Sequence, residues 1–271
     1  MRTRTTGNEG QVRRYWRTEY LEGVDFLTAS IRRAPTHCHL HHGFTISAVE
    51  SGTLPLAYRD VTLPLQPGDI VISGPDVPQS YAALNGLCKY RTLIVGERAI
   101  PASLAGTLAG ENASVARISD RAAWSCFIEG TGSVENGSKS DSDFVETVSL
   151  RLLGKVAENV AYRFRIESPE IRTAKSYIEA HYDRSPKIEE LAAVVHLSPF
   201  YLMRRFKAEV GISTHAFLNQ FRIKKAREWI GQRKSLADIT YDLGFVDQSH
   251  FYRTFSKVVG ISAANYISGL H

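Results

Sequence analysis

The C-terminal part of the chain contains two similar stretches, "LMRRFKAEVGIS" at residues 202–213 and "FYRTFSKVVGIS" at residues 251–262. They align at a shift of 49 residues, and six of the aligned pairs are identical. Upstream, "ELAAVVHLS" (190–198) aligns with "DITYDLGFV" (238–246) at a shift of 48, so the second copy has one extra residue in its turn. A short helix, a tight turn and a second helix form a helix-turn-helix. The repeat therefore predicts two helix-turn-helix units in one domain.

Serine, proline and glycine mark the expected ends of the helices in this region. "SP" occurs at residues 168–169, 185–186 and 198–199. A serine at the N-cap can accept a hydrogen bond from a free backbone N–H, and proline suits the first helical position. Glycines at 211, 231 and 260 fall where helices should stop. These signals predict helices over residues 169–182, 186–195, 199–210, 214–230, 236–243 and 248–259, with a short one from 263.

The second helix of each unit has one apolar face and one outward face. Leu202, Phe206 and Val210 are spaced i, i+4, i+8, which predicts a stripe facing the core, and the second copy repeats this pattern. The outward residues are Phe200, Met203, Arg204 and Lys207 in the first copy, and Gln248, Ser249, Tyr252, Arg253 and Ser256 in the second. Arginine and glutamine side chains can hydrogen-bond guanine and adenine edges in the major groove. A charged stripe can also be a solvated face, but its recurrence in both units favours DNA contact.

The net charge of the chain lies in the same region. Residues 168–271 hold 15 Lys+Arg and 10 Asp+Glu, whereas residues 1–167 hold 18 of each. A basic module joined to a neutral one is typical of a part that binds a polyanion attached to a part with another task. We expect salt-dependent phosphate contacts from the following side chains: Lys207, Lys224, Lys225, Arg227 and Ser256.

The stretches "LAAVVHLSPFYLMRRFKAEVG" (191–211) and "DLGFVDQSHFYRTFSKVVG" (242–260) resemble the two helix-turn-helix units of the AraC/XylS transcription regulators. The likeness covers about residues 168–271 without a gap. It implies that a long helix near 214–230 holds two recognition helices in successive major grooves. Thr240 departs from the pattern, because the family usually has alanine there, packed under the turn. The resemblance implies base contacts from Phe200, Met203, Arg204, Gln248, Ser249, Tyr252 and Arg253.

The N-terminal half has no helical periodicity. Short segments rich in β-branched and aromatic residues, separated by glycine and proline, predict strands in a small antiparallel barrel or sandwich; they cover residues 43–49, 54–63, 69–73 and 90–95. The fold class we expect is therefore α+β: a β-barrel, a helical linker and an all-α domain with two helix-turn-helix units. The turn pattern of this half resembles the cupin barrel of AraC-like regulators, and its matching pieces are residues 37–39, 49–52, 67–73 and 77–80.

Four histidines within "HCHLHH" (37–42) raise the question of a metal site. A cupin metal site resembles an H-x-H pair, a glutamate four or five residues later, and a third histidine on a later strand. Neither H-x-H pair has that glutamate, because residues 43–46 are Gly-Phe-Thr-Ile, and the third histidine corresponds to Gln79. Two imidazoles alone leave a divalent metal under-coordinated. We therefore expect no metal and no cofactor. The histidines either line the barrel mouth, where they could hydrogen-bond an effector, or belong to an exposed loop.

The stretch "RRYWR" (13–17) mixes cations with aromatic rings. The forked guanidinium suits carboxylates and phosphates. One hypothesis is that an anionic or nucleotide-like effector binds where this arm meets the barrel, and the alternative is a solvated basic arm. The candidate effector-binding residues are Arg13, Arg17, Arg33, His37, His39 and Tyr58.

Between the two halves, "EGTGSVENGSKSDSD" (129–143) is almost entirely Gly, Ser, Asn and acidic residues, which predicts a flexible loop. The following segment, 144–162, has apolar residues at spacings of three and four, which predicts a helix with an apolar stripe. The stripe can pack on its own barrel. The family resemblance implies instead that it pairs with a partner subunit through Val145, Val148, Leu152 and Val156.

We therefore expect a cupin-like effector domain over residues 1–125, the loop and dimerisation helix over 126–167, and the DNA-binding domain over 168–271, with helix-turn-helix units at about 186–210 and 236–259. No apolar run reaches the ~18 residues of a membrane span. The three cysteines, an odd number spread far apart, favour a reducing cytoplasm over a disulfide framework.

These features predict a cytoplasmic, sequence-specific transcription regulator, an activator and not an enzyme. Its predicted partners are double-stranded promoter DNA, a small-molecule effector, a second copy of the chain and RNA polymerase, with no membrane. Two alternatives stay open. The regulator could be controlled by a protein partner without a small ligand, or the chain could be a metal-dependent cupin enzyme fused to a DNA-binding domain.

Overall fold

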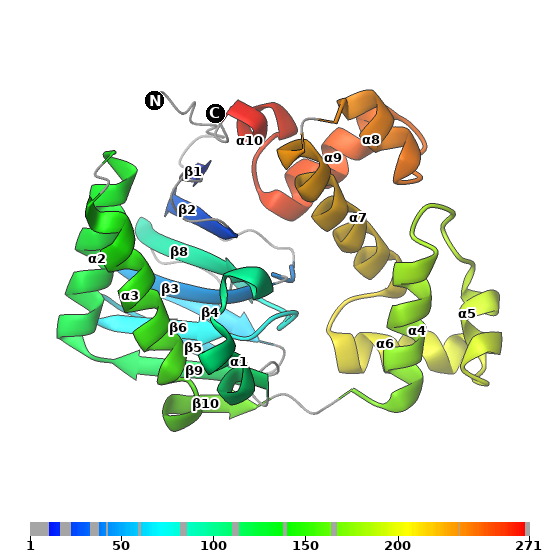
Figure 1. Ribbon diagram of the computed structural model, residues 1–271. Coiled ribbons are helices and arrows are strands. Elements are labelled where there is room, and N and C mark those ends of the chain that lie inside the picture. Colours follow the sequence, from blue (N-terminus) through cyan, green and yellow to red (C-terminus); the bar gives the residue numbers. More distant parts are fainter. Residues whose placement is uncertain are drawn as a thin grey trace. The chain divides into compact units, whose positions relative to one another are not determined.

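The computed structural model describes residues 11–16, 23–32, 38–41, 43–58, 61–81, 86–109, 114–137, 140–163, 167–232 and 234–268. Its contacts divide the chain into two compact units, residues 1–164 with 264–271 and residues 165–263. Figure 1 shows strands and helices in the first unit and only helices in the second. No helix among the described residues is long and apolar enough to cross a membrane.

The first unit is built on two antiparallel sheets. Seven strands form the larger sheet in the order β1-β2-β8-β3-β6-β9-β10, and three form the smaller sheet in the order β5-β4-β7. The strands are β1 (Gln11–Trp16), β2 (Val24–Ile31), β3 (Gly43–Ser51), β4 (Leu54–Tyr58), β5 (Val61–Leu65), β6 (Asp69–Ser73), β7 (Ser80–Tyr81), β8 (Cys88–Gly96), β9 (Ser114–Ser119) and β10 (Val160–Arg163). The predicted antiparallel β-rich domain is confirmed.

The two faces of the larger sheet differ in chemistry, as the alternation of side chains along a strand allows. In β3, Phe44, Ile46 and Ala48 belong to the apolar core, whereas Thr45 and Ser47 between them are buried polar residues. The apolar face packs against α1 (Ala102–Ala109), α2 (Arg121–Glu135) and α3 (Ser140–Gly154), and Figure 1 shows α2 and α3 lying along the sheet. The polar face looks toward the smaller sheet.

The flexible loop predicted over residues 129–143 is wrong, because α2 extends to Glu135 and α3 begins at Ser140. The carboxylate of Asp120 accepts hydrogen bonds from the first turn of α2 and fixes its start. Phe127 and Val134 on α2 are buried in the core of this unit. Tertiary packing therefore stabilises a helix that the glycine and serine content of this stretch disfavours.

The apolar stripe that follows packs on its own barrel. Leu152 and Val156 are buried in the core of the first unit, and Val148 is half-buried against it. The prediction that Leu152 and Val156 bind a partner subunit is therefore wrong, since both are already covered. The side chain of Val145 lies outside the described residues. The predicted helix also ends early, at Gly154, because a short 3-10 turn and β10 occupy residues 157–163.

The second unit contains six helices within its described residues, and a seventh begins at its last residue. They are α4 (Pro169–Ala180), α5 (Ile188–Val194), α6 (Pro199–Val210), α7 (Thr214–Gly231), α8 (Leu236–Asp242), α9 (Gln248–Val259) and α10 (Ala263–Ser268). The predicted starts agree with these bounds except for α5, which begins two residues later. Ser185 does not cap a helix, because its backbone adopts φ 51° and its hydroxyl accepts a hydrogen bond from Arg222.

The turns of the two helix-turn-helix units share one backbone feature. His196 in the first turn and Gly244 in the second occupy matching positions, and both have positive φ, 54° and 71°. A Cβ on Gly244 would lie 1.9 Å from the carbonyl oxygen of Asp183 and 2.6 Å from Arg222 Nη2, so glycine is required there. The hydroxyl of Thr240, which replaces the alanine of the family pattern, donates to the Leu236 carbonyl at 2.7 Å. Its burial therefore leaves no polar atom unsatisfied.

Arg222, in the middle of α7, connects both helix-turn-helix units to this helix. Its side chain is only 2% exposed. Nε donates to the carbonyl oxygen of Tyr182 at 2.6 Å, and Nη2 donates to Ser185 Oγ at 2.9 Å, both in the loop before α5. The guanidinium carbon lies 5.4 Å from the centroid of the Phe245 ring, in the turn between α8 and α9. Burial lowers the pKa of Arg222 to about 10, so the group is still a cation at neutral pH.

Replacing Arg222 with methionine should lower the free energy of unfolding of the C-terminal unit by about 2 kcal/mol, because the Tyr182 carbonyl loses its donor inside the protein. Differential scanning calorimetry of the full chain measures this change. Arg184→Met is the matched control, since Arg184 is exposed and pairs with Glu190 at the surface; it should move the transition far less. Equal shifts for the two variants would contradict the role of Arg222.

Candidate functional site

In the first helix-turn-helix unit, the recognition helix is α6. Its exposed face carries the side chains that the sequence pattern predicts to point outward. Phe200 is 72% exposed and Met203 is 46% exposed, and Arg204 and Lys207 are exposed beside them. These positions follow the i, i+3, i+4, i+7 spacing of one helical face. The opposite stripe of Leu202, Phe206 and Val210 is buried, as expected.

In the second helix-turn-helix unit, the recognition helix is α9, and it repeats this arrangement with different side chains. Phe251, Phe255 and Val259 are buried, and the five predicted contact residues on the other side are exposed: Gln248, Ser249, Tyr252, Arg253 and Ser256. Residues 49 positions apart correspond between the two helices: Phe200 with Ser249, Met203 with Tyr252, Arg204 with Arg253, and Lys207 with Ser256. The structure thus brings the predicted base-contacting residues of each unit onto one face of one helix.

Local capping fixes both recognition helices at their ends. Ser198 Oγ accepts from the backbone N–H of Tyr201 at 3.3 Å, and Asp247 accepts from that of His250 at 2.6 Å. Gly211 and Gly260 end the helices, both in the left-handed conformation with φ 85°. The outward side chains are therefore mounted on well-defined helices, which suits contact with base edges.

The cations on these faces are unpaired among the described residues, in contrast to several other cations of the C-terminal unit. Arg204, Lys207 and Arg253 form no ion pair with any described residue. By contrast, Arg205 on the flank of α6 pairs with Glu170 at 3.3 Å and with Glu209 at 2.7 Å. A cation without a carboxylate partner is available to a phosphate or a base edge.

Lys257, in the last turn of α9, is a further exposed cation without an ion pair among the described residues. Sequence reasoning missed it because its counterpart in the first copy is Ala208, so the repeat gave no matching signal.

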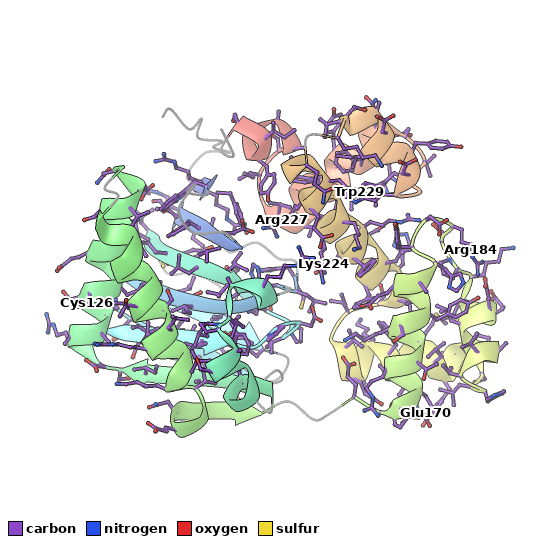
Figure 2. The ribbon with its side chains drawn as sticks, in the orientation of Figure 1. Cys126, Glu170, Arg184, Lys224, Arg227 and Trp229 are labelled. Carbon is purple, nitrogen blue, oxygen red and sulfur yellow. The ribbon has the colours of Figure 1, made fainter. Side chains whose placement is uncertain are left out.

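The residues of α7 that we predict to contact phosphate are less exposed than the outward-facing cations on α6 and α9. Lys224, Lys225 and Arg227 are all half-buried, and Lys225 pairs with Glu228 at 3.2 Å. The ammonium of Lys224 lies 5.9 Å from the centroid of the Phe221 ring. Figure 2 shows Lys224 and Arg227 about one turn apart on this helix. Their contact with phosphate stays a prediction.

In the N-terminal unit, residues of the cupin-like turn pattern lie close together in space, as that pattern predicts. His39 and Gln79 form a β-bridge, with N–H to O distances of 2.9 Å in both directions. Gln79 Nε2 donates to Thr45 Oγ1 at 3.2 Å. In a cupin metal site, the positions of Gln79 and Thr45 would hold the third histidine and the glutamate. Here these two side chains form a hydrogen bond with each other. No group of three metal-ligating side chains occurs among the described residues, which leave out His37 and His42.

The polar face of the larger sheet contributes to three hydroxyl pairs, of which the first two are buried and the third is part-buried; in the last two the partner tyrosine comes from the smaller sheet. Their oxygen–oxygen distances are 2.8 Å for Ser47 with Thr92, 2.7 Å for Tyr58 with Ser73, and 3.1 Å for Tyr81 with Tyr90. Burial raises the pKa of Tyr58 and of Tyr81, so both phenols are neutral. Tyr58, a predicted effector residue, is completely buried in this layer.

Arg13 lies on the same face of the larger sheet. The register aligns Arg13 with Ala29 on β2 and Ala29 with Tyr90 on β8, so the Arg13 and Tyr90 side chains are on one side. Nε and Nη2 of Arg13 are buried and have no hydrogen-bond partner among the described residues. Burial lowers the pKa of Arg13, but the Coulombic influence of Tyr90 and Tyr81 outweighs it and the pKa is raised. Sequence reasoning singled out Arg13 but missed the two tyrosines.

The next residue, Arg14, lies on the opposite face and forms an ion pair there, although its buried Nε has no hydrogen-bond partner among the described residues. Its Nη1 is 3.0 Å from Glu135 Oε1, and Nη1 of Arg91 is 2.6 Å from Glu135 Oε2. These ion pairs fasten β1 and β8 to the end of α2. Of the other predicted effector residues, His39 is half-buried with its ring 5.9 Å from that of Tyr81, while Arg17, Arg33 and His37 lie outside the described residues.

Known proteins resemble both units. A helix-turn-helix domain model matches residues 191–268, and an AraC-like ligand binding domain model matches residues 27–123. The regulatory protein PocR of Salmonella typhimurium is 33% identical over 97 residues, which is 35% of this chain and 32% of that protein. The regulator MtrA of Neisseria gonorrhoeae is 32% identical over 80 residues, 29% of this chain and 27% of that protein. The chain thus spans about a third of the length of these curated relatives.

The fold of the whole chain also has solved counterparts. The crystal structure of ToxT from Vibrio cholerae O395 covers 90% of this chain and 98% of that chain, with a TM-score of 0.54 and 13% sequence identity. At this identity the likeness shows the fold alone, a β-rich cupin-like domain followed by a helical domain. The two matching domain models lie one in each half and together cover more than half of the sequence, and the chain belongs to the AraC family of DNA-binding transcription regulators.

Proposed function

We propose that this regulator activates transcription from specific promoters in the cytoplasm in response to a small anionic effector bound by its N-terminal unit. The observation that carries the DNA part is the pair of recognition helices with matching outward faces, whose arginines have no carboxylate partner among the described residues. The chain acts by binding and not as an enzyme.

In this proposal each recognition helix enters a major groove and the two sets of outward side chains read bases. Arg204 and Arg253 recognise guanine through two hydrogen bonds, which discriminates against other bases by about 1–3 kcal/mol each. Gln248, Ser249, Tyr252, Phe200 and Met203 complete the base contacts. Phosphate contacts from Lys207, Lys224, Lys225, Arg227 and Ser256 supply the affinity that salt weakens.

The anionic character of the effector follows from Arg13. Burying a cation without a partner is costly, and a carboxylate or phosphate is the group that a guanidinium binds best. Tyr90 lies on the same side of the larger sheet as Arg13, and its hydroxyl is 3.1 Å from that of Tyr81 on β7. Because one hydroxyl of this pair donates to the other, the pair has one O–H left to donate to an anion. His39, beside Tyr81, provides a ring for stacking or a further hydrogen bond. The effector therefore binds in the polar layer, with Arg13 as its charged anchor.

Effector binding would regulate the protein by changing the population of DNA-competent states. Activation implies contact with RNA polymerase, and we propose that the chain acts as a homodimer. Because Leu152 and Val156 are buried in the core of one chain, the dimer contact must use other residues.

Replacing Arg253 with alanine should weaken binding to a selected DNA site by about 5- to 150-fold, the equivalent of losing one bidentate base contact. Binding to a scrambled duplex should change little. Fluorescence anisotropy with both duplexes at one salt concentration measures the two affinities. Arg184→Ala is the control for loss of a surface cation outside the recognition helices. An equal loss on both duplexes would show that Arg253 contacts only phosphate.

A thermal-shift screen of small carboxylates and phosphates should identify compounds that stabilise the N-terminal unit. The stabilisation should disappear in Arg13→Met, because the anion loses its charged anchor. It should persist in Arg32→Met, which removes an exposed arginine just after β2. If no anionic compound stabilises the protein, or if both variants respond like the unmodified chain, the anionic effector is refuted.

A further inference from the structure

The two recognition helices differ most at two matching positions. Where α9 has Ser249 and Tyr252, which both carry hydroxyl groups, α6 has Phe200 and Met203, which carry no hydrogen-bonding side-chain atom other than a thioether. The next matching position is arginine in both helices. The two recognition helices therefore share an arginine, but the side chains beside it are apolar in α6 and carry hydroxyl groups in α9.

Phe200 and Met203 contribute little to the folded chain on its own. Phe200 is 72% exposed and Met203 is 46% exposed, while the core side of α6 is already filled by its buried stripe. Phe200 is the second residue of the helix, and the N-terminal residues of a recognition helix are the ones that reach base edges. An exposed apolar pair at this place gains its burial energy only when something covers it.

The surroundings of the pair favour DNA over a protein as the covering surface. Arg204 and Lys207 lie on the same helical face and form no ion pair with any described residue. On the flank, the guanidinium carbon of Arg204 lies 5.6 Å from the centroid of the Tyr201 ring. A patch that combines apolar surface with unpaired positive charge is complementary to a polyanion that also exposes apolar groups.

Among the base edges in the major groove, only thymine presents an apolar group, its 5-methyl. We propose that the first helix-turn-helix unit recognises thymine through this methyl group, with Phe200 and Met203 as the specificity-determining residues. The second unit reads hydrogen-bonding edges through Gln248, Ser249 and Arg253. This inference rests on the proposed function, because it assigns the base class that one half of the DNA site must contain.

The test begins with selection of binding sites from random duplex DNA by the full chain, in parallel with Phe200→Ser and Tyr201→Ser. The first variant gives α6 the residue found at the matching position of α9. The second removes a neighbouring exposed ring about 100° away around the helix, and is the matched control. Each thymine of the selected site is then replaced singly by deoxyuridine, which removes only the methyl group.

We expect affinity to fall about fourfold for each contacted methyl. At least one sensitive thymine should lose its preference in the Phe200→Ser selection, and at that position this variant should bind the thymine and deoxyuridine duplexes equally. Tyr201→Ser should keep the difference. Selected sites with no sensitive thymine, or a methyl effect that survives in Phe200→Ser, would overturn thymine recognition by this residue while leaving the regulator intact. Failure to enrich any sequence would overturn the proposed function itself.

Discussion

The buried guanidinium of Arg222 is the interaction on which the DNA-binding unit depends. From one position in α7 it holds the loop before the first helix-turn-helix unit by two hydrogen bonds and lies against Phe245 in the turn of the second unit. Gly244 is required at that turn because any larger residue would overlap Asp183 and Arg222. Together with the packing of α6 and α9 on α7, these contacts hold both recognition helices against one helix. A fixed spacing suits the contact with two parts of one DNA site that we propose.

In the N-terminal unit, side chains alternate between the two faces of the larger sheet, so that one face packs the core and the other is polar. The face toward α2 and α3 is apolar, and at its edge Arg14 and Arg91 share the carboxylate of Glu135. The other face is lined by paired hydroxyls and by Arg13, two of whose nitrogens have no partner among the described residues. Adjacent arginines on β1 thus face opposite sides of the sheet: Arg14 pairs with Glu135, and Arg13 is the residue that we propose binds an anion. Phe200 and Met203 on α6, which we propose contact thymine, likewise offer surface that the folded chain does not cover itself.

The sequence predicted the recognition helices to the residue because their signals are local: Ser198 and Pro199 start α6, and Gly211 ends it. The resemblance to the cupin pattern also implied that Gln79 corresponds to the third histidine of that pattern, and the structure pairs Gln79 with His39. It failed over residues 129–143, where a helix depends on packing of Phe127 and Val134 that no local pattern shows. The role of Arg222 was hidden for a related reason. From the sequence alone, an arginine in the middle of a helix is expected at the surface. Only the fold shows that Tyr182 and Ser185 lie against Arg222. The DNA and effector contacts themselves stay predictions, since they depend on partners outside the chain.

Hydroxyl-radical footprinting of the full chain on a selected site tests whether α7 fixes the spacing of the two recognition helices. If α7 holds the two recognition helices at a fixed spacing, the chain should protect two patches on one face of the duplex, about one helical turn or 10 base pairs apart. Arg222→Met should blur or remove one patch while the other persists. A single protected patch, or two patches on opposite faces of the duplex, would contradict the account.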